Sequence, residues 1–216
     1  MVNLDSDAVA RDWQQFHLAP DLHIGQHVLV QHGLGQIAEL NRLGAARVGL
    51  RRALAWDPEG LEVNDSASIA KLDENIIFTA ITKRPVFLEK IAAIGVCFVM
   101  RSVLMSVDSK RIAVLQKTVG DQTWANFMDS SRSKPRLILS TRIPEENITL
   151  ANLVTTIYAI GSSVFRKGCA NSPPWMQRRV ALKLDGLSKH SILVSEADAA
   201  ATLAWVTPEL ALIGVN

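Results

Sequence analysis

The 216-residue chain has few cysteines, little net charge and no long apolar run. Its two cysteines, Cys97 and Cys169, lie far apart in the sequence. This excludes a cysteine-based zinc knuckle, a CxxC redox motif and a disulfide-dense secreted scaffold. The most apolar stretch, residues 91–100, is too short for a membrane-spanning helix, which needs roughly 20 apolar residues. We expect a cytoplasmic protein that does not insert directly into a membrane.

The charges are nearly balanced, with 23 Lys and Arg against 21 Asp and Glu. The basic residues occur as doublets, such as Lys110–Arg111, and not as a stripe interleaved with aromatic residues. Nucleic acid is therefore not expected as a partner. A chain with 48% hydrophobic and 20% charged residues has the composition of a folded globular protein.

Apolar residues at spacings of three and four predict a mainly α fold with at most a minor β element. A long helical pattern opens at Pro85, and a second covers residues 150–164. We expect these two segments to pack together and to bury one common set of residues: Ile91, Ile94, Phe98, Leu153, Ile157 and Ile160. The expected architecture is a single helical domain over residues 1–216. In it, residues 1–60 form an N-terminal helical part whose packing the sequence leaves open, and residues 63–216 form the core.

Polar residues mark several expected helix ends. Asp108 or Ser109 is suited to cap a helix, and Ser195 with Asp198 three positions later resembles a capping box. Residues 130–135 are polar and end in proline, so we expect an exposed loop there. Pro208 predicts the first position of a separate last helical turn.

A cluster of histidines raises the question of a metal site. His23 and His27 have the spacing that places two imidazoles on one face of a helix. However, no HExxH motif is present, a suitably spaced third ligand is lacking, and Gly25 weakens the helix that would present the pair. We expect no bound metal and histidines that are solvated or hydrogen-bonded.

A GxGxxA motif formed by Gly33, Gly35 and Ala38 follows a short apolar run, as in a dinucleotide site. Such a site also needs a strand that ends in an acidic residue about 20 positions later. Asp57 has that distance but belongs to a DPEG turn. Glycines at helix ends are the simpler interpretation, and a dinucleotide-binding enzyme using Gly33 and Gly35 is the alternative. Since no GxSxG motif is present either, we expect no cofactor and no catalytic residues.

Three features between Ile91 and Asp185 occur in an order that resembles a known family. The first is the apolar helix around Ile94-Gly-Val-Cys-Phe98, followed by a Lys-Arg-Ile-Ala-Val-Leu segment and a segment over residues 120–128. The second is Ala159-Ile-Gly-Ser-Ser-Val-Phe165, a small-residue helix that ends in an aromatic residue. The third is a proline break followed by Trp-Met-Gln-Arg-Arg-Val-Ala-Leu-Lys-Leu-Asp. These features resemble the SctK family of type III secretion accessory proteins, whose members include YscK, HrpD and the nodulation protein NolU.

The resemblance implies a mainly helical, non-enzymatic adaptor of the sorting platform. Such an adaptor links the cytoplasmic ring protein of the SctQ type to the inner-membrane ring protein of the SctD type. It would lie in the cytoplasm, peripheral to the inner membrane through its protein partners. In symbiotic bacteria the role would extend to nodulation.

We place the partner-binding surface in the C-terminal third, because Trp and Arg often dominate the energetics of interfaces. The residues are Phe165, Trp175, Arg178, Arg179 and Lys183. On a helix, Trp175 and the three cations would share one face, while Met176, Val180 and Leu184 would turn to the core. The alternative is that Trp175 covers the end of a core helix and the arginines reach into solvent.

Overall fold

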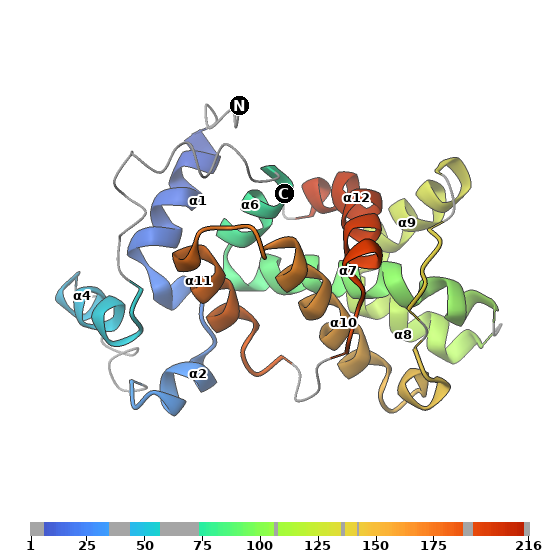
Figure 1. Ribbon diagram of the computed structural model, residues 1–216, viewed down its shortest axis with the longest axis horizontal. Helices are drawn as coiled ribbons and strands as arrows, with labels where there is room; N and C mark the ends of the chain where they lie inside the picture. The colour runs from blue at the N-terminus through green and yellow to red at the C-terminus, as the bar shows by residue number, and fades with distance from the viewer. Residues whose placement is uncertain are drawn as a thin grey trace. The chain divides into compact units, whose positions relative to one another are not determined.

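Helices account for most of the chain in the computed structural model, which describes residues 7–34, 44–56, 74–105, 108–134, 137–141, 143–187 and 192–213. The helices are joined by turns and extended connections, and no strand occurs among these residues (Figure 1). The predicted mainly α fold is confirmed. No helix in the described ranges combines the length and the apolar character that crossing a membrane requires.

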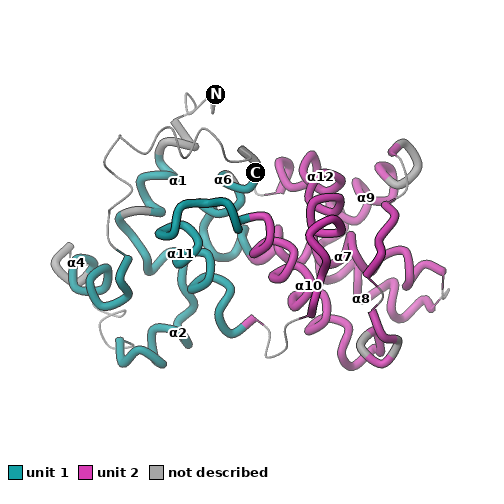
Figure 2. Tube along the Cα trace, in the orientation of Figure 1, with its two compact units in different colours: residues 1–87, 169–186 teal, residues 88–168, 187–216 magenta. Residues whose placement is uncertain are grey.

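The chain divides into two compact units (Figure 2). The first unit comprises residues 1–87 and 169–186, and the second comprises residues 88–168 and 187–216. The unit boundaries thus differ from the expected division at residues 60–63, which lies outside the described residues. The single domain over residues 1–216 stays a prediction.

The first unit is built from short helices. They are α1 (Asp7–Leu18), the 3-10 helix η1 (Pro20–Leu22), α2 (Gln26–Gln31), α4 (Gly44–Ala53), α6 (Glu74–Ile81), α11 (Pro174–Leu184) and the start of α7 (Arg84–Met105). Its core is aromatic, since Phe16, Trp56 and Phe87 are fully buried. The indole Nε1 of Trp56 donates a hydrogen bond of 2.8 Å to the carbonyl of Phe16. This bond satisfies one of the carbonyls that the last turn of α1 leaves open.

The second unit contains longer helices. They are the remainder of α7, α8 (Ser109–Val119), α9 (Asp121–Ser133), the 3-10 helix η3 (Glu145–Ile148), α10 (Leu153–Gly168) and α12 (Glu196–Leu212). The predicted common core is confirmed: Ile91, Ile94, Phe98, Leu153, Ile157 and Ile160 are each at most 4% exposed. The two strongest sequence patterns therefore lie on the helices that form the core of this unit.

Two glycines let α7 and α10 approach closely. A Cβ atom placed on Gly95 would lie 2.0 Å from the carbonyl oxygen of Ile157, and one on Gly161 would lie 2.1 Å from that of Ile91. These positions cannot carry a side chain unless the helices move apart. The glycines, which are unfavourable in a helix by themselves, are thus explained by packing.

The carboxylate of Asp198 fastens residues 140 and 141 to the first turn of α12. It accepts bonds from Ser140 N at 2.8 Å, Ser140 Oγ at 2.9 Å, Thr141 N at 2.7 Å and Thr141 Oγ1. Ser195 caps the helix as predicted, by accepting the N–H of Asp198. The Asp198 carboxylate accepts from Ser140 and Thr141, and the N–H of Ser195 donates to Thr141 Oγ1 at 3.3 Å, so the expected capping box does not form.

Two other expected helix ends are wrong and one is confirmed. Asp108 caps α8, because its side chain accepts the N–H groups of residues 110 and 111. The expected loop at residues 130–135 is helical as far as residue 133. The buried Glu209 accounts for this difference, since its Oε1 accepts a hydrogen bond from Ser130 and lies 2.6 Å from Lys134 Nζ. Pro208 lies inside α12 and begins no new turn.

Candidate functional site

Most of the predicted partner-binding residues are in the protein interior. Phe165, on α10 of the second unit, is fully buried, while the other four lie on α11 of the first unit. On α11, Arg179 and Lys183 are at most 1% exposed, Trp175 is half-buried, and Arg178 is exposed. A single exposed face formed by these residues is therefore wrong. Met176, Val180 and Leu184 are buried as predicted, so α11 buries two adjoining sides.

The guanidinium of Arg179 lies among three aromatic rings. Its Cζ is 5.3 Å from the ring centre of Phe16, 5.1 Å from that of Trp56 and 4.9 Å from that of Trp175. Cation–π contacts of this kind contribute about 2 kcal/mol or more when they are desolvated. Its Nη2 also lies 3.5 Å from the carbonyl oxygen of Trp56, just beyond the end of α4. The long stem and the planar head of arginine therefore fill this core.

The ammonium group of Lys183 is at the end of α6. Its Nζ donates hydrogen bonds of 2.6 Å to the carbonyls of Ala80 and Thr82, and it lies 4.2 Å from the ring centre of Phe87. The last carbonyls of a helix lack partners within the helix and carry partial negative charge, which favours a cation there. Burial of Lys183 is therefore compensated by the end of α6 and by an aromatic face.

A third cation follows the same rule. Arg84 Nη1 donates a hydrogen bond of 2.8 Å to the carbonyl of Lys183, in the last turn of α11. Arg179, Lys183 and Arg84 thus contact carbonyls at or just beyond the ends of α4, α6 and α11. In this unit, basic side chains hold helix ends together, which is a structural role.

His23 is buried beside Lys183. Its Nδ1 is 3.1 Å from the carbonyl oxygen of Thr82 and 3.5 Å from Lys183 Nζ. Burial and the ammonium of Lys183 lower the pKa of His23 to about 3. The ring is thus neutral at pH 7, and the shorter contact assigns the Nδ1 proton to a bond with Thr82. A histidine with such a low pKa is a poor general base at neutral pH.

His23 and His27 do not share a helix. His23 follows η1, whereas His27 lies in α2 on the far side of Gly25. His27 is exposed, and its Nε2 lies 3.1 Å from the carbonyl oxygen of Asp185. In the described part of the chain, no group of three His, Cys, Asp or Glu side chains could hold a metal ion.

Gly33 closes a helix and does not follow a strand. Its N–H bonds to the carbonyl of Val30, and the N–H of Leu34 bonds to that of Leu29 over 2.7 Å, with a φ of +70° at Gly33. This is the Schellman ending of α2, which favours glycine because of the positive φ. The apolar run that precedes the GxGxxA motif is α2 itself, whereas a dinucleotide site requires a strand there. Gly35 lies outside the described residues.

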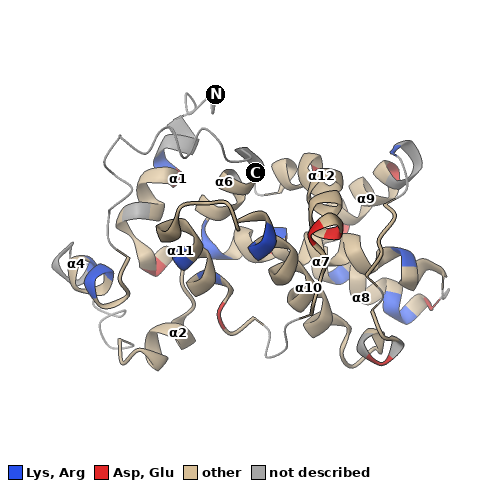
Figure 3. Ribbon diagram, in the orientation of Figure 1, with Lys and Arg blue, Asp and Glu red and all other residues tan. Residues whose placement is uncertain are grey.

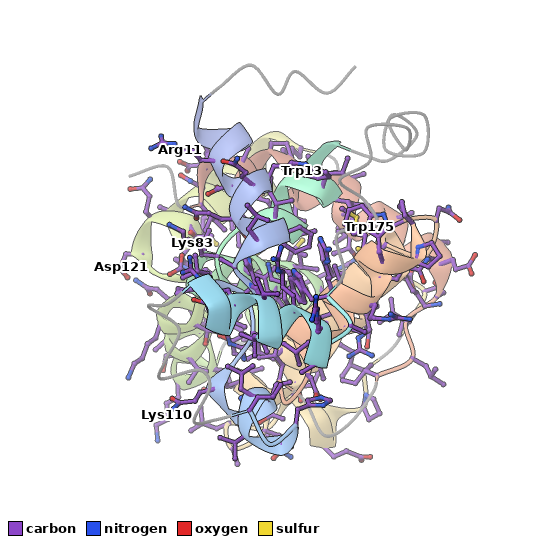
Figure 4. The ribbon with its side chains drawn as sticks, turned by 90° about the vertical axis from the view of Figure 1, so that its left-hand side faces the viewer. Arg11, Trp13, Lys83, Lys110, Asp121 and Trp175 are labelled. Atoms are coloured by element: carbon purple, nitrogen blue, oxygen red, sulfur yellow. The ribbon has the colours of Figure 1, made fainter. Side chains whose placement is uncertain are left out.

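A half-buried tryptophan pair faces the surface of the first unit. The rings of Trp13 on α1 and Trp175 on α11 meet edge to face, with 6.2 Å between their centres. Figure 4 labels both residues. Arg178 is exposed on α11, three residues after Trp175. Trp13 was not among the residues predicted for the surface. The available signal was its position three residues before the buried Phe16, which places Trp13 at the edge of the buried face of α1.

Neither cysteine is poised for chemistry. Burial raises the pKa of the Cys169 thiol to about 12 and also raises that of Cys97. Because the thiolate is the reactive form, both thiols are inert at neutral pH in the folded protein.

Comparisons with protein-family models, with curated proteins and with solved structures give no match to this chain.

Proposed function

We propose that the protein is a non-enzymatic adaptor of a type III secretion apparatus, located in the cytoplasm and held at the inner membrane by its protein partners. It links the sorting-platform ring protein of the SctQ type to the inner-membrane ring protein of the SctD type. In a symbiotic host the same apparatus would serve nodulation.

The observation that carries this proposal is the order of features between residues 91 and 185, which resembles the SctK family. The mainly α fold is in line with that resemblance. The described residues of this region form apolar α7, then α8 and α9, then α10 with its closing Phe165, and then α11 after the proline pair. The proposal thus rests on a sequence of elements and not on a catalytic constellation.

The residues that the sequence offered as candidate metal-binding, partner-binding or dinucleotide-binding groups make contacts that stabilise the fold. His23 bonds to a backbone carbonyl, Lys183 bonds to two of them, and Gly33 ends a helix. These contacts favour an interaction protein. Among the described residues of the Gly33 segment, no observation favours the alternative, a dinucleotide-binding enzyme that uses Gly33 and Gly35.

The test is affinity purification of the tagged full-length chain from its native host, together with deletion of its gene. We expect the SctQ-type and SctD-type ring proteins to co-purify, and secretion to stop on deletion. A tagged variant carrying Gly49→Ala, an exposed helical position with open space around it, serves as a matched control that should behave as wild type. Normal secretion after deletion, with neither ring protein recovered, would contradict the proposal.

A further inference from the structure

The surface around the tryptophan pair is suited to one kind of partner. We infer that Trp13, Trp175 and Arg178 form a docking surface for an acidic protein segment that carries an apolar or aromatic side chain next to its carboxylates. This inference rests on the proposed function, since it names the chemistry by which the adaptor would hold a partner.

The exposed charge of the first unit is mainly positive. Figure 3 marks where Lys, Arg, Asp and Glu lie along the ribbon. Among its described side chains, those of Arg11, Arg52, Lys83 and Arg178 are exposed cations, and that of Asp185 is an exposed carboxylate. The described half-buried carboxylates are those of Asp12 and Asp21, and Asp21 is partly screened by its ion pair with Arg47, at 3.3 Å. Charge complementarity therefore favours an acidic partner for this unit.

The buried core reinforces the choice. Trp175 already faces the guanidinium of Arg179, at 4.9 Å from its ring centre. A second cation at the same ring would be repelled by Arg179, whereas carboxylates near Arg178 would be attracted. The half-buried rings of Trp13 and Trp175 offer apolar area that is held in place by packing, so little side-chain entropy is lost on binding. Tryptophan and arginine together are typical of the centre of an interface.

The first experiment measures binding of the full chain to each purified ring protein by calorimetry. We expect Arg178→Glu to weaken binding at least about tenfold, and Trp13→Ala to weaken it similarly. Arg52→Glu is the matched control, because it reverses an exposed cation of the same unit on another helix. It should leave affinity within about twofold of wild type. If Trp13→Ala melts at a lower temperature than wild type, the affinity of Arg178→Glu alone tests the docking surface.

The second experiment is photo-crosslinking in the native host from benzoylphenylalanine at Gln14, which is exposed beside Trp13, with position 52 as control. An adduct with an acidic segment of an identified protein, lost in Arg178→Glu, supports the surface even if neither ring protein binds. The proposed function would then fail while the surface stands.

Three results would overturn the surface. In the first, the wild-type protein binds a ring protein, and Arg178→Glu and Arg52→Glu change the affinity by the same factor. This result leaves the proposed function intact. Another is no adduct from position 14 above that from position 52. The third is binding to vesicles of equal parts phosphatidylcholine and phosphatidylglycerol that is lost in Arg178→Glu, which would assign the surface to a membrane.

Discussion

Substitution of Gly161 by alanine tests the close approach of α7 and α10. The added Cβ would lie 2.1 Å from the carbonyl oxygen of Ile91 and 3.1 Å from its Cγ2. The oxygen belongs to a helix backbone and cannot rotate away, so the helices must separate by at least about 1.3 Å to restore an ordinary contact. We therefore expect Gly161→Ala to destabilise the second unit.

The magnitude follows from two opposing terms. Overpacking costs about 1–3 kcal/mol, and a clash with backbone puts this case at the upper end. Alanine regains about 1 kcal/mol because it is the better helix former. The net loss in the free energy of unfolding is about 2 kcal/mol. With a urea m value of about 2 kcal/mol/M, the unfolding midpoint falls by about 1 M.

Gly49→Ala is the matched control. Gly49 also lies within a helix, but a Cβ there would meet no atom within 4 Å. This variant should gain up to about 1 kcal/mol. Urea unfolding gives the two values, and hydrogen exchange assigns them to α7 and α10 or to α4. An unchanged or raised midpoint for Gly161→Ala would refute the packing argument.

Three further predictions concern buried polar groups. Burial alone would raise the pKa of Asp198, but its hydrogen bonds to Ser140 and Thr141 hold that pKa well below the usual value. The ionised carboxylate therefore stabilises the fold fully above about pH 4, and this stabilisation is lost as the pH falls further. Below about pH 4, the urea unfolding midpoint of Asp198→Asn should vary less with pH than that of wild type. In the folded protein His23 stays neutral down to about pH 3, whereas in the unfolded chain it is protonated below about pH 6.5. The free energy of unfolding should therefore fall by about 1.4 kcal/mol per pH unit between these two values, and less steeply in His23→Phe. Parallel pH profiles of the two proteins would contradict this. Arg179→Glu should lower the free energy of unfolding by at least about 3 kcal/mol and Arg178→Glu by less than about 0.5, and equal melting curves would show that Arg179 is not a core residue.

The mainly α fold was predictable because α7 and α10 carry apolar residues at helical spacing, and local periodicity reports burial. The glycines on the same helices were not interpretable from sequence, since Gly95 and Gly161 are explained only by the backbone of a helix far along the chain. Residues 130–133 look like a loop by composition. Their helical state is accompanied by bonds from Ser130 and Lys134 to Glu209, more than 70 residues away.

The candidate site was harder to predict than the fold, for a related reason. Lysine and arginine are usually exposed, so Arg179 and Lys183 were expected on a surface with Trp175. Their burial depends on rings and helix ends contributed by residues 16, 56, 80, 82 and 87. No local pattern contains that information. What the sequence did indicate is the buried side of α11, because Met176, Val180 and Leu184 repeat at spacings of four.

The interior and the surface of the first unit are connected through one ring. Trp175 packs against Arg179 on one side and against Trp13 on another, so the buried guanidinium helps to set the position of the rim that we assign to a partner. A double charge reversal at Arg178 and Arg179 would therefore abolish binding whether or not Arg178 touches the partner, because Arg179→Glu disturbs the core. Only the single Arg178→Glu variant, with a melting curve like that of wild type, distinguishes loss of a direct contact with the partner from loss of binding through a disturbed core.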